Sequence, residues 1–130
     1  MKINIKHIDP EFVDERGGIA RVLDQNKYKI QTILRITSKA GTIRSNHYHK
    51  KDYHYLYIES GKCEYSEKSA KDDSDPVETV VLHPGDLVLS RPNIIHAVKF
   101  VEDSVIYAFS TENRDPDKYE DDTVRITIVE

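Results

Sequence analysis

Short segments rich in Ile, Val, Thr and Tyr recur along this chain, and turn-forming residues close almost every one of them. In residues 30–36, apolar residues recur at every second position, which is the period of a strand. Ala40-Gly41, Ser60-Gly61 and Pro84-Gly85-Asp86 are typical of the turns that end such segments. No segment has a convincing helical period, so the pattern predicts an all-β sandwich or barrel.

The alternation predicts roughly ten strands. They are expected over residues 3–5, 19–23, 30–36, 42–49, 53–59, 63–67, 77–82, 87–90, 97–101, 105–111 and 123–129. A turn is expected over 14–18, a charged loop over 68–76, and one short helical turn is possible within the polar stretch 112–122. We find no repeat and no linker, so residues 1–130 are expected to form a single domain.

Composition narrows the classes of function. The net charge of −4 argues against a nucleic-acid-binding protein, because phosphate binding requires a basic surface. No apolar run approaches membrane-spanning length, and residues 1–10 lack the hydrophobic centre of a signal peptide. The only cysteine, Cys63, cannot form an intramolecular disulfide and is expected to be a small core residue. We therefore expect a cytoplasmic protein without nucleic-acid or membrane partners.

Six histidines occur, and three of them fall within residues 47–54. Side chains alternate along a strand, so His47 and His49 are expected to point to one face. His54 and His96 each share a face with apolar residues two and four positions further on, which predicts that both point inward. The four imidazoles could therefore converge inside the fold.

Neutral imidazole is a common metal ligand, so the cluster predicts a divalent transition-metal site formed by His47, His49, His54 and His96. Residue types alone do not choose among zinc, iron, nickel and manganese. A metal-free acid/base pocket built from the same rings remains the alternative. The other two histidines, His7 and His83, are expected to be ordinary hydrogen-bonded or exposed residues.

The spacing of these residues resembles the first motif of the cupin superfamily. The motif positions hold Gly41, His47, His49, His54 and Gly61, with His54 in the place of the usual glutamate. In metal-binding cupins the positions of these histidines and the histidine of a second motif, matched here by His96, are ligands, which implies the same four histidine ligands here.

The second cupin motif is a Pro-Gly-Asp turn followed by a proline and a histidine. Pro84-Gly85-Asp86, Pro92 and His96 resemble it, although the spacing before the histidine is one residue short and a glycine is missing after the proline. Together the two motifs imply a single-domain jelly-roll β-barrel of the RmlC-like cupin type.

A narrower resemblance is to bacterial sugar-nucleotide cupins, the dTDP-4-keto-6-deoxyglucose 3,4-ketoisomerases and the 3,5-epimerases. It rests on Asp14-Glu15-Arg16-Gly17 and on Arg44-x-x-His47-x-His49-Lys50-Lys51. Those enzymes work without a metal, and the resemblance implies His49 as the leading base, His47 as its partner and Arg44 beside the substrate. The ketoisomerases lack the histidines found here at 54 and 96, so the chain resembles a relative with a more metal-like site.

A nucleotide sugar requires cations for its diphosphate and an aromatic surface for its base. Arg16, Arg44 and Lys50 are the predicted anion contacts, and Tyr55 is the predicted platform. In a regular strand Arg44 would point away from His47, so contact with substrate requires a bulge. For Tyr55 and its neighbouring tyrosines, packing or a dimer surface is the alternative.

These features favour an isomerase or epimerase of nucleotide-linked keto-sugars that moves protons with histidine. A metal-dependent, iron-type dioxygenase acting on a small organic substrate is one alternative. A non-catalytic cupin that binds a sugar or metabolite is another, because cupins host many chemistries. A homodimer is expected, since open strand edges need covering.

Overall fold

The computed structural model describes residues 2–24, 27–112 and 120–130, and within these ranges the chain forms twelve strands. They are β1 (Asn4–His7), β2 (Phe12–Asp14), β3 (Gly17–Ile19), β4 (Thr32–Ser38), β5 (Ile43–His49), β6 (His54–Ser60), β7 (Cys63–Ser69), β8 (Glu78–Leu82), β9 (Asp86–Ser90), β10 (Ile94–Phe100), β11 (Ser104–Ser110) and β12 (Thr123–Arg125). One helical turn covers residues 120–122, inside the stretch predicted for it, while 113–119 lie outside the described residues.

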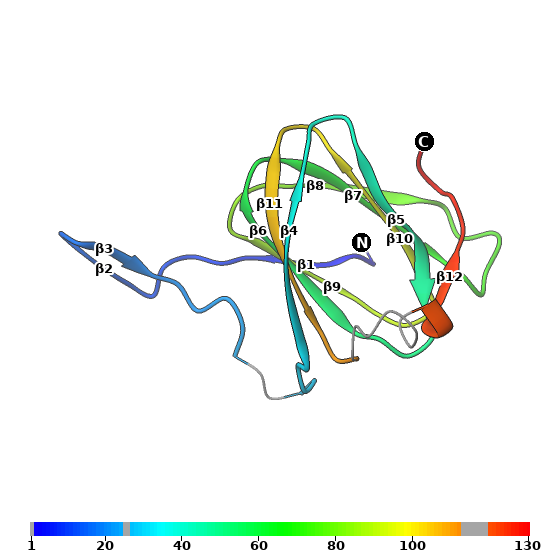
Figure 1. The fold of residues 1–130 in the computed structure, drawn as a ribbon, viewed down its shortest axis with the longest axis horizontal. Helices are drawn as coiled ribbons and strands as arrows, with labels where there is room; N and C mark the ends of the chain where they lie inside the picture. The colour runs from blue at the N-terminus through cyan, green and yellow to red at the C-terminus, as the bar shows by residue number, and fades with distance from the viewer. Residues whose placement is uncertain (1, 25–26, 113–119) are drawn as a thin grey trace.

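Two five-stranded antiparallel sheets enclose the interior of the molecule (Figure 1). One has the order β1-β9-β6-β11-β4 and the other β12-β5-β10-β7-β8. The inner faces supply a core that includes Ile58, Tyr65, Val88 and Phe100, each at most 1% exposed. This architecture confirms the predicted all-β jelly roll, and it follows from alternating strands that each bury one face.

The Pro84-Gly85-Asp86 turn is attached to β1 through its glycine and its aspartate. Asp86 accepts a hydrogen bond from the backbone N–H of His83 at 2.8 Å, and its other oxygen lies 2.8 Å from Nδ1 of His7. Gly85 has a φ of +93°, and a Cβ added there would lie 2.8 Å from the His7 ring. The bond to Asp86 raises the pKa of the exposed His7 above its usual value.

Two predicted strands are wrong in their extent. Instead of a strand over 19–23, residues 12–19 form the hairpin β2–β3, which projects away from the two sheets (Figure 1). Gly17 has a φ of +133°, which allows the chain to reverse so early, and β3 therefore ends at Ile19. The strand predicted over 123–129 ends at Arg125, and the backbone N–H groups of Ile128 and Val129 beyond it bind the side chain of Asn46 in β5 rather than the backbone of a neighbouring strand.

In the part of the chain that the structure describes, no helix has the length and apolar character needed to cross a membrane.

Candidate functional site

The site begins with a β-bulge in β5. His47 pairs with His96 of β10, but the next residue of β10, Ala97, pairs with Ser45, so Asn46 is an extra residue. Ser45 and Asn46 have φ values of +75° and +54°. Because directly paired residues of antiparallel strands share a face, the bulge places Arg44 on the same inner face as His47. The orientation expected for Arg44 in a regular strand is thereby corrected.

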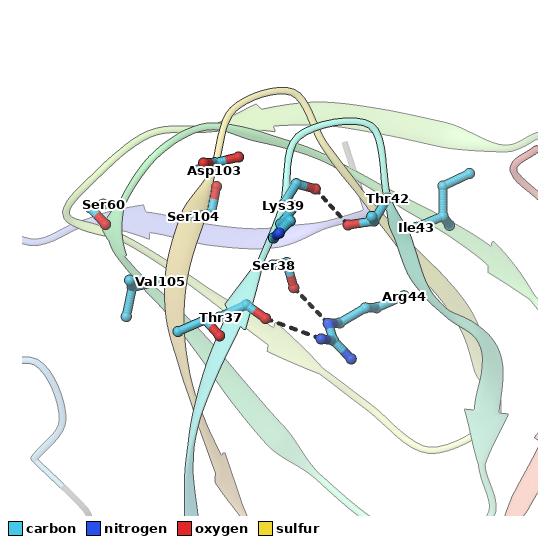
Figure 2. Close-up of a pocket in the computed structure, with 10 residues that line it drawn as sticks. All are labelled: Thr37, Ser38, Lys39, Thr42, Ile43, Arg44, Ser60, Asp103, Ser104 and Val105. Carbon is cyan, nitrogen blue, oxygen red and sulfur yellow. Dashed lines mark hydrogen bonds between the residues drawn. The ribbon is translucent and has the colours of Figure 1, made fainter.

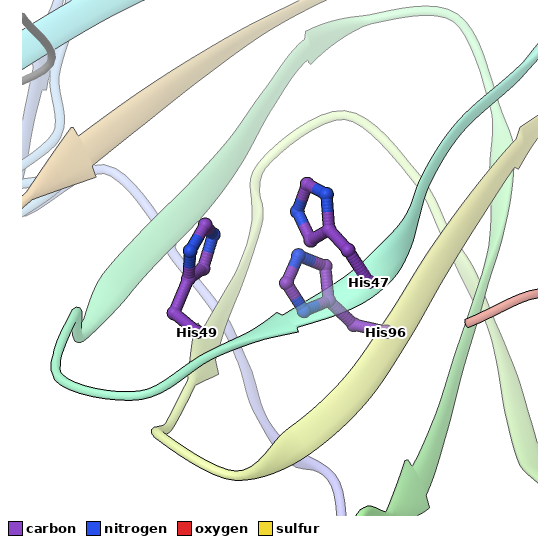
Figure 3. A group of neighbouring side chains, drawn as sticks. All are labelled: His47, His49 and His96. Atoms are coloured by element: carbon purple, nitrogen blue, oxygen red, sulfur yellow. The ribbon is translucent and has the colours of Figure 1, made fainter. Parts of the chain in front are cut away.

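The four predicted histidines come together inside the fold. His47, His49, His54 and His96 are 7%, 2%, 3% and 1% exposed. The His47 ring centroid lies 4.7 Å from those of both His49 and His96, and the centroids of His54 and His96 are 4.9 Å apart. Figure 3 shows His47 and His49 of β5 beside His96 of β10. Neighbouring strands of both sheets therefore supply one compact group of imidazoles.

Three of these rings have polar partners at Nδ1. His96 Nδ1 lies 3.2 Å from Oγ of Ser90, and His54 Nδ1 lies 3.3 Å from Oδ2 of Asp52. His49 Nδ1 lies 3.3 Å from Oγ1 of Thr123 and 3.7 Å from a carboxylate oxygen of Asp122. The hydrogen bonds at His96 and His49 orient these rings and favour one tautomer, whereas the Asp52 carboxylate lies within ion-pair distance of His54 without forming a hydrogen bond to its Nδ1.

Burial also affects the protonation of one ring of the cluster, that of His96. Removal from water, and secondarily the other three histidines, hold the pKa of His96 well below its usual value. A neutral ring is the form that binds a metal ion. Ligand atoms of His47, His49 and His96 all lie within 4.8 Å of one another, and those of His49, Asp52 and His54 form a second such group. By donor chemistry, both groups fit a divalent transition metal.

A cavity of about 420 Å³ reaches the cluster. Its polar wall includes His47, His54 and His96, and two guanidinium groups, Arg44 and Arg125, also line it. Imidazoles that can exchange protons therefore face the same space as two permanent cations. His49 is absent from this lining, so His54 is better placed to meet a molecule in the cavity.

Arg44 also lines a second, wider hollow of about 720 Å³ between the ends of β4, β5 and β11 (Figure 2). Its Nε donates a hydrogen bond to Oγ of Ser38 at 2.6 Å, and Nη2 donates to the carbonyl of Thr37 at 3.0 Å. The side chain thus reaches from β5 of one sheet to β4 of the other. Since Arg44 borders both spaces, it stands where the outer hollow meets the histidine cavity.

The structure does not bring the other predicted substrate contacts to this cavity. Arg16 lies in the β2–β3 hairpin, where it pairs with Asp14. Lys50 is exposed, and its Nζ donates to the carbonyl of Asp121 at 3.3 Å. Tyr55 is half-buried on the face of β6 opposite to His54. None of the three is among the residues that line the histidine cavity.

Two residues of the site were not anticipated. Asp52 lies between the strands predicted over 42–49 and 53–59, and its position two residues before His54 could have suggested a shared face. It is only 2% exposed, and its Oδ1 accepts hydrogen bonds from the backbone N–H groups of Thr111 and Glu112. Arg125 enters the site because β12 pairs with β5, opposite His47. No local sequence pattern predicts that pairing.

Cys63 is fully buried, as expected of a core residue. Burial raises the pKa of its thiol to about 12, so the sulfur is protonated and unreactive at neutral pH. It therefore takes no part in the candidate chemistry.

Comparison with known proteins identifies the fold. No protein-family model and no curated protein matches the sequence. Among solved structures, a 3,4-ketoisomerase from Helicobacter canadensis superposes with a TM-score of 0.78 at 21% identity, covering 96% of this chain and 91% of that one. The sugar 3,4-ketoisomerase QdtA from Thermoanaerobacterium thermosaccharolyticum, in complex with TDP, gives 0.75 at 20%, covering 96% and 90%.

A dTDP-4-dehydrorhamnose 3,5-epimerase from Sulfolobus tokodaii gives a TM-score of 0.75 at 16% identity, covering 98% of this chain and 84% of that one. The likeness extends over almost the whole of each chain. It shows that this chain has the RmlC-like cupin fold, as the sequence motifs implied.

Proposed function

We propose that this protein is an isomerase or epimerase that moves a proton next to the carbonyl of a nucleotide-linked keto-sugar. The observation that carries the proposal is the cavity in which Arg44 and Arg125 stand beside buried imidazoles. Guanidinium groups suit the phosphates of such a substrate, and imidazoles suit transfer of its carbon-bound proton near neutral pH. The fold shared with sugar-nucleotide ketoisomerases and epimerases supports the same substrate class.

The geometry favours His54 as the base. Its ring lines the cavity, and Asp52 lies 3.3 Å from its Nδ1. In this proposal His54 takes the proton from the carbon beside the carbonyl, the C–H electron pair forms the enolate, and the proton returns to a sugar carbon. The Asp52 carboxylate stabilises the imidazolium while it carries that proton. His49, implied as the base by resemblance, has its own acidic neighbour but does not line the cavity.

We further propose that His47, His49 and His96 bind a divalent transition metal. Three buried imidazoles with ligand atoms within 4.8 Å support this, and the neutral state of His96 suits a ligand. A bound ion would act as a Lewis acid toward a carbonyl or enolate oxygen. The metal's identity does not follow from three nitrogen donors.

Deuterium exchange tests the proposed reaction directly. The protein, metal-free and loaded with zinc, is incubated in deuterated water with dTDP-4-keto-6-deoxyglucose and related nucleotide keto-sugars, and proton NMR follows the C–H groups beside the carbonyl. We expect exchange with the wild type, loss with His54→Asn, and no loss with the matched control His83→Asn, an exposed residue. No exchange across the panel in either state would overturn the proposal.

A second candidate, an iron-type oxygenase, is favoured by one observation. His49, Asp52 and His54 form a group of two histidines and one carboxylate within 4.8 Å, the ligand set of many non-haem iron oxygenases. An oxygen electrode distinguishes the two functions. Substrate-dependent oxygen uptake by the iron-loaded protein would favour the oxygenase, whereas exchange without oxygen uptake favours the isomerase.

We also propose that the protein is a homodimer whose contact surface includes the β2–β3 hairpin. The hairpin projects from the sheets (Figure 1), and its cross-strand partners Phe12 and Ile19 are 51% and 60% exposed. An isolated two-stranded hairpin with an apolar face is marginally stable in water, so a second copy of the chain is its natural cover.

A further inference from the structure

The residue that creates the β5 bulge also binds the C-terminal end of the chain. Oδ1 of Asn46 accepts hydrogen bonds from the backbone N–H groups of Ile128 at 2.9 Å and Val129 at 3.1 Å. Its Nδ2 donates to the carbonyl of Val129 at 2.9 Å. The backbone carbonyl of Asn46 also accepts from the N–H of Ile126 at 2.9 Å. We call residues 126–129 the C-terminal tail.

These contacts stabilise an unfavourable backbone. Ser45 and Asn46 are consecutive non-glycine residues with positive φ, a conformation in which Cβ crowds the backbone. Such strain persists only where the surrounding structure holds it. Asparagine tolerates positive φ better than most residues, and both polar ends of its side chain are used here to bind the tail.

The bulge decides which way Arg44 points. It places Arg44 opposite Val98 of β10 and on the face of the histidines, whereas removal of the extra residue would turn Arg44 to the other face. The tail is continuous with β12, whose Arg125 lines the same cavity. Both cations of the cavity therefore depend on the position of this segment.

We propose that the C-terminal tail is a positioning element of the site, and that Asn46 is the positioning residue through which it holds Arg44 in the cavity. The tail contacts no substrate in this scheme. It acts by holding the bulge, and the bulge holds the guanidinium against Ser38 and Thr37.

The first test does not depend on what the protein catalyses. NMR measures solvent exchange of the Arg44 Nε–H, which the Ser38 bond protects, together with the ¹³C shifts of Ser45 and residue 46 that report positive φ. Asn46→Gly keeps positive φ accessible but removes the contacts, whereas deletion of residues 128–130 removes their partners and leaves the bulge sequence intact. Deletion of Glu130 alone is the matched control, since it retains Ile128 and Val129.

We expect both variants to speed Arg44 Nε–H exchange by about 10-fold or more, and the Glu130 deletion to leave it unchanged. Asn46→Asp keeps the acceptor and loses the donor, so its Arg44 Nε–H exchange rate should fall between that of the wild type and that of Asn46→Gly. The proposal would be overturned if both Asn46→Gly and the 128–130 deletion showed the same Arg44 Nε–H exchange rate and the same ¹³C shifts as the wild type. If one variant fails to fold, the other decides the question.

The second test rests on the proposed function and measures kcat and KM with the nucleotide keto-sugar. If the tail acts through Arg44, Asn46→Gly raises KM more than it lowers kcat. In an Arg44→Ala background, adding Asn46→Gly should then change KM much less than it does in the wild type. Additive effects would contradict action through Arg44. If the wild type is inactive but the NMR result is as expected, the proposed reaction fails and the positioning role of the tail stands.

Discussion

Nδ1 of His54 lies 3.3 Å from Oδ2 of Asp52, and the two residues are only 3% and 2% exposed. The carboxylate therefore places a negative charge at ion-pair distance from a buried imidazole. Asp52 also anchors the backbone after β11 through Oδ1, so its two oxygens serve different neighbours. Asp52, just before β6, therefore contacts both a histidine of the candidate site and the backbone after β11.

Asp52→Asn separates these two roles, because an amide oxygen can still accept the bonds at the Oδ1 position. We expect kcat for proton exchange to fall by about 10–100-fold with a smaller change in thermal stability, since the amide cannot stabilise an imidazolium as a carboxylate does. Exchange rates and melting curves measure the two effects. Asp73→Asn, which removes an exposed carboxylate, is the control and should behave as wild type.

Metal binding should stabilise the fold, since a ligand that binds only the native state adds free energy by mass action. After treatment with a chelator, zinc or cobalt at about 100 times its Kd should add about 2.7 kcal/mol and raise the melting temperature. His47→Ala and His96→Ala should abolish the increase, whereas His83→Ala should retain it. An equal increase in all four proteins would place the ion outside the cluster.

Two glycines with similar backbone angles should differ sharply in their tolerance of alanine. Gly41 has a φ of +87° with nothing within 4 Å of an added Cβ, so Gly41→Ala should cost only about 1–2 kcal/mol for the left-handed conformation. Gly61 has a φ of +89°, and the added Cβ would lie 2.5 Å from the carbonyl oxygen of Asp103. Gly61→Ala should therefore cost at least about 3 kcal/mol in urea denaturation. Equal losses would contradict this packing.

The His7–Asp86 bond predicts a pH-dependent stability. The pKa of His7 is raised in the folded state, so the stabilisation is fully present below the unfolded pKa of about 6.5 and is lost as pH rises through the folded value. The difference in unfolding free energy between wild type and His7→Ala should therefore shrink as the pH rises above about 6.5. A difference that is constant or grows with pH would count against the bond. His83→Ala supplies the baseline.

The proposed dimer predicts a solution mass of twice 15.0 kDa. A charge on the apolar face of the hairpin would be buried without a partner in the dimer, so Phe12→Asp or Ile19→Asp should produce monomers in light scattering. Val101→Asp is the matched control, because Val101 is an exposed apolar residue, 46% accessible, outside the hairpin. A monomeric wild type would rule the dimer out.

The jelly roll was implied by the resemblance to the cupin motifs, whereas local alternation along the chain was sufficient to predict an all-β sandwich or barrel and the inward direction of His54 and His96. Both properties depend on a period of two within a single strand and on apolar neighbours that must be buried. The same rule placed His47 and His49 on one face, because the bulge lies before them and leaves their mutual spacing regular. Turn residues such as Gly41 and Gly61 marked the ends of strands for equally local reasons.

Only the tertiary structure decided which residues join those histidines. The face of Arg44 depends on one extra residue that β10 leaves unpaired, and Asn46 is held in that place by a tail more than 80 residues away in sequence. Arg125 reaches the cavity through the pairing of β12 with β5. Arg16, in contrast, lies on the β2–β3 hairpin and not beside the cavity. Register, bulges and the docking of chain ends depend on contacts between distant segments, which no local period encodes.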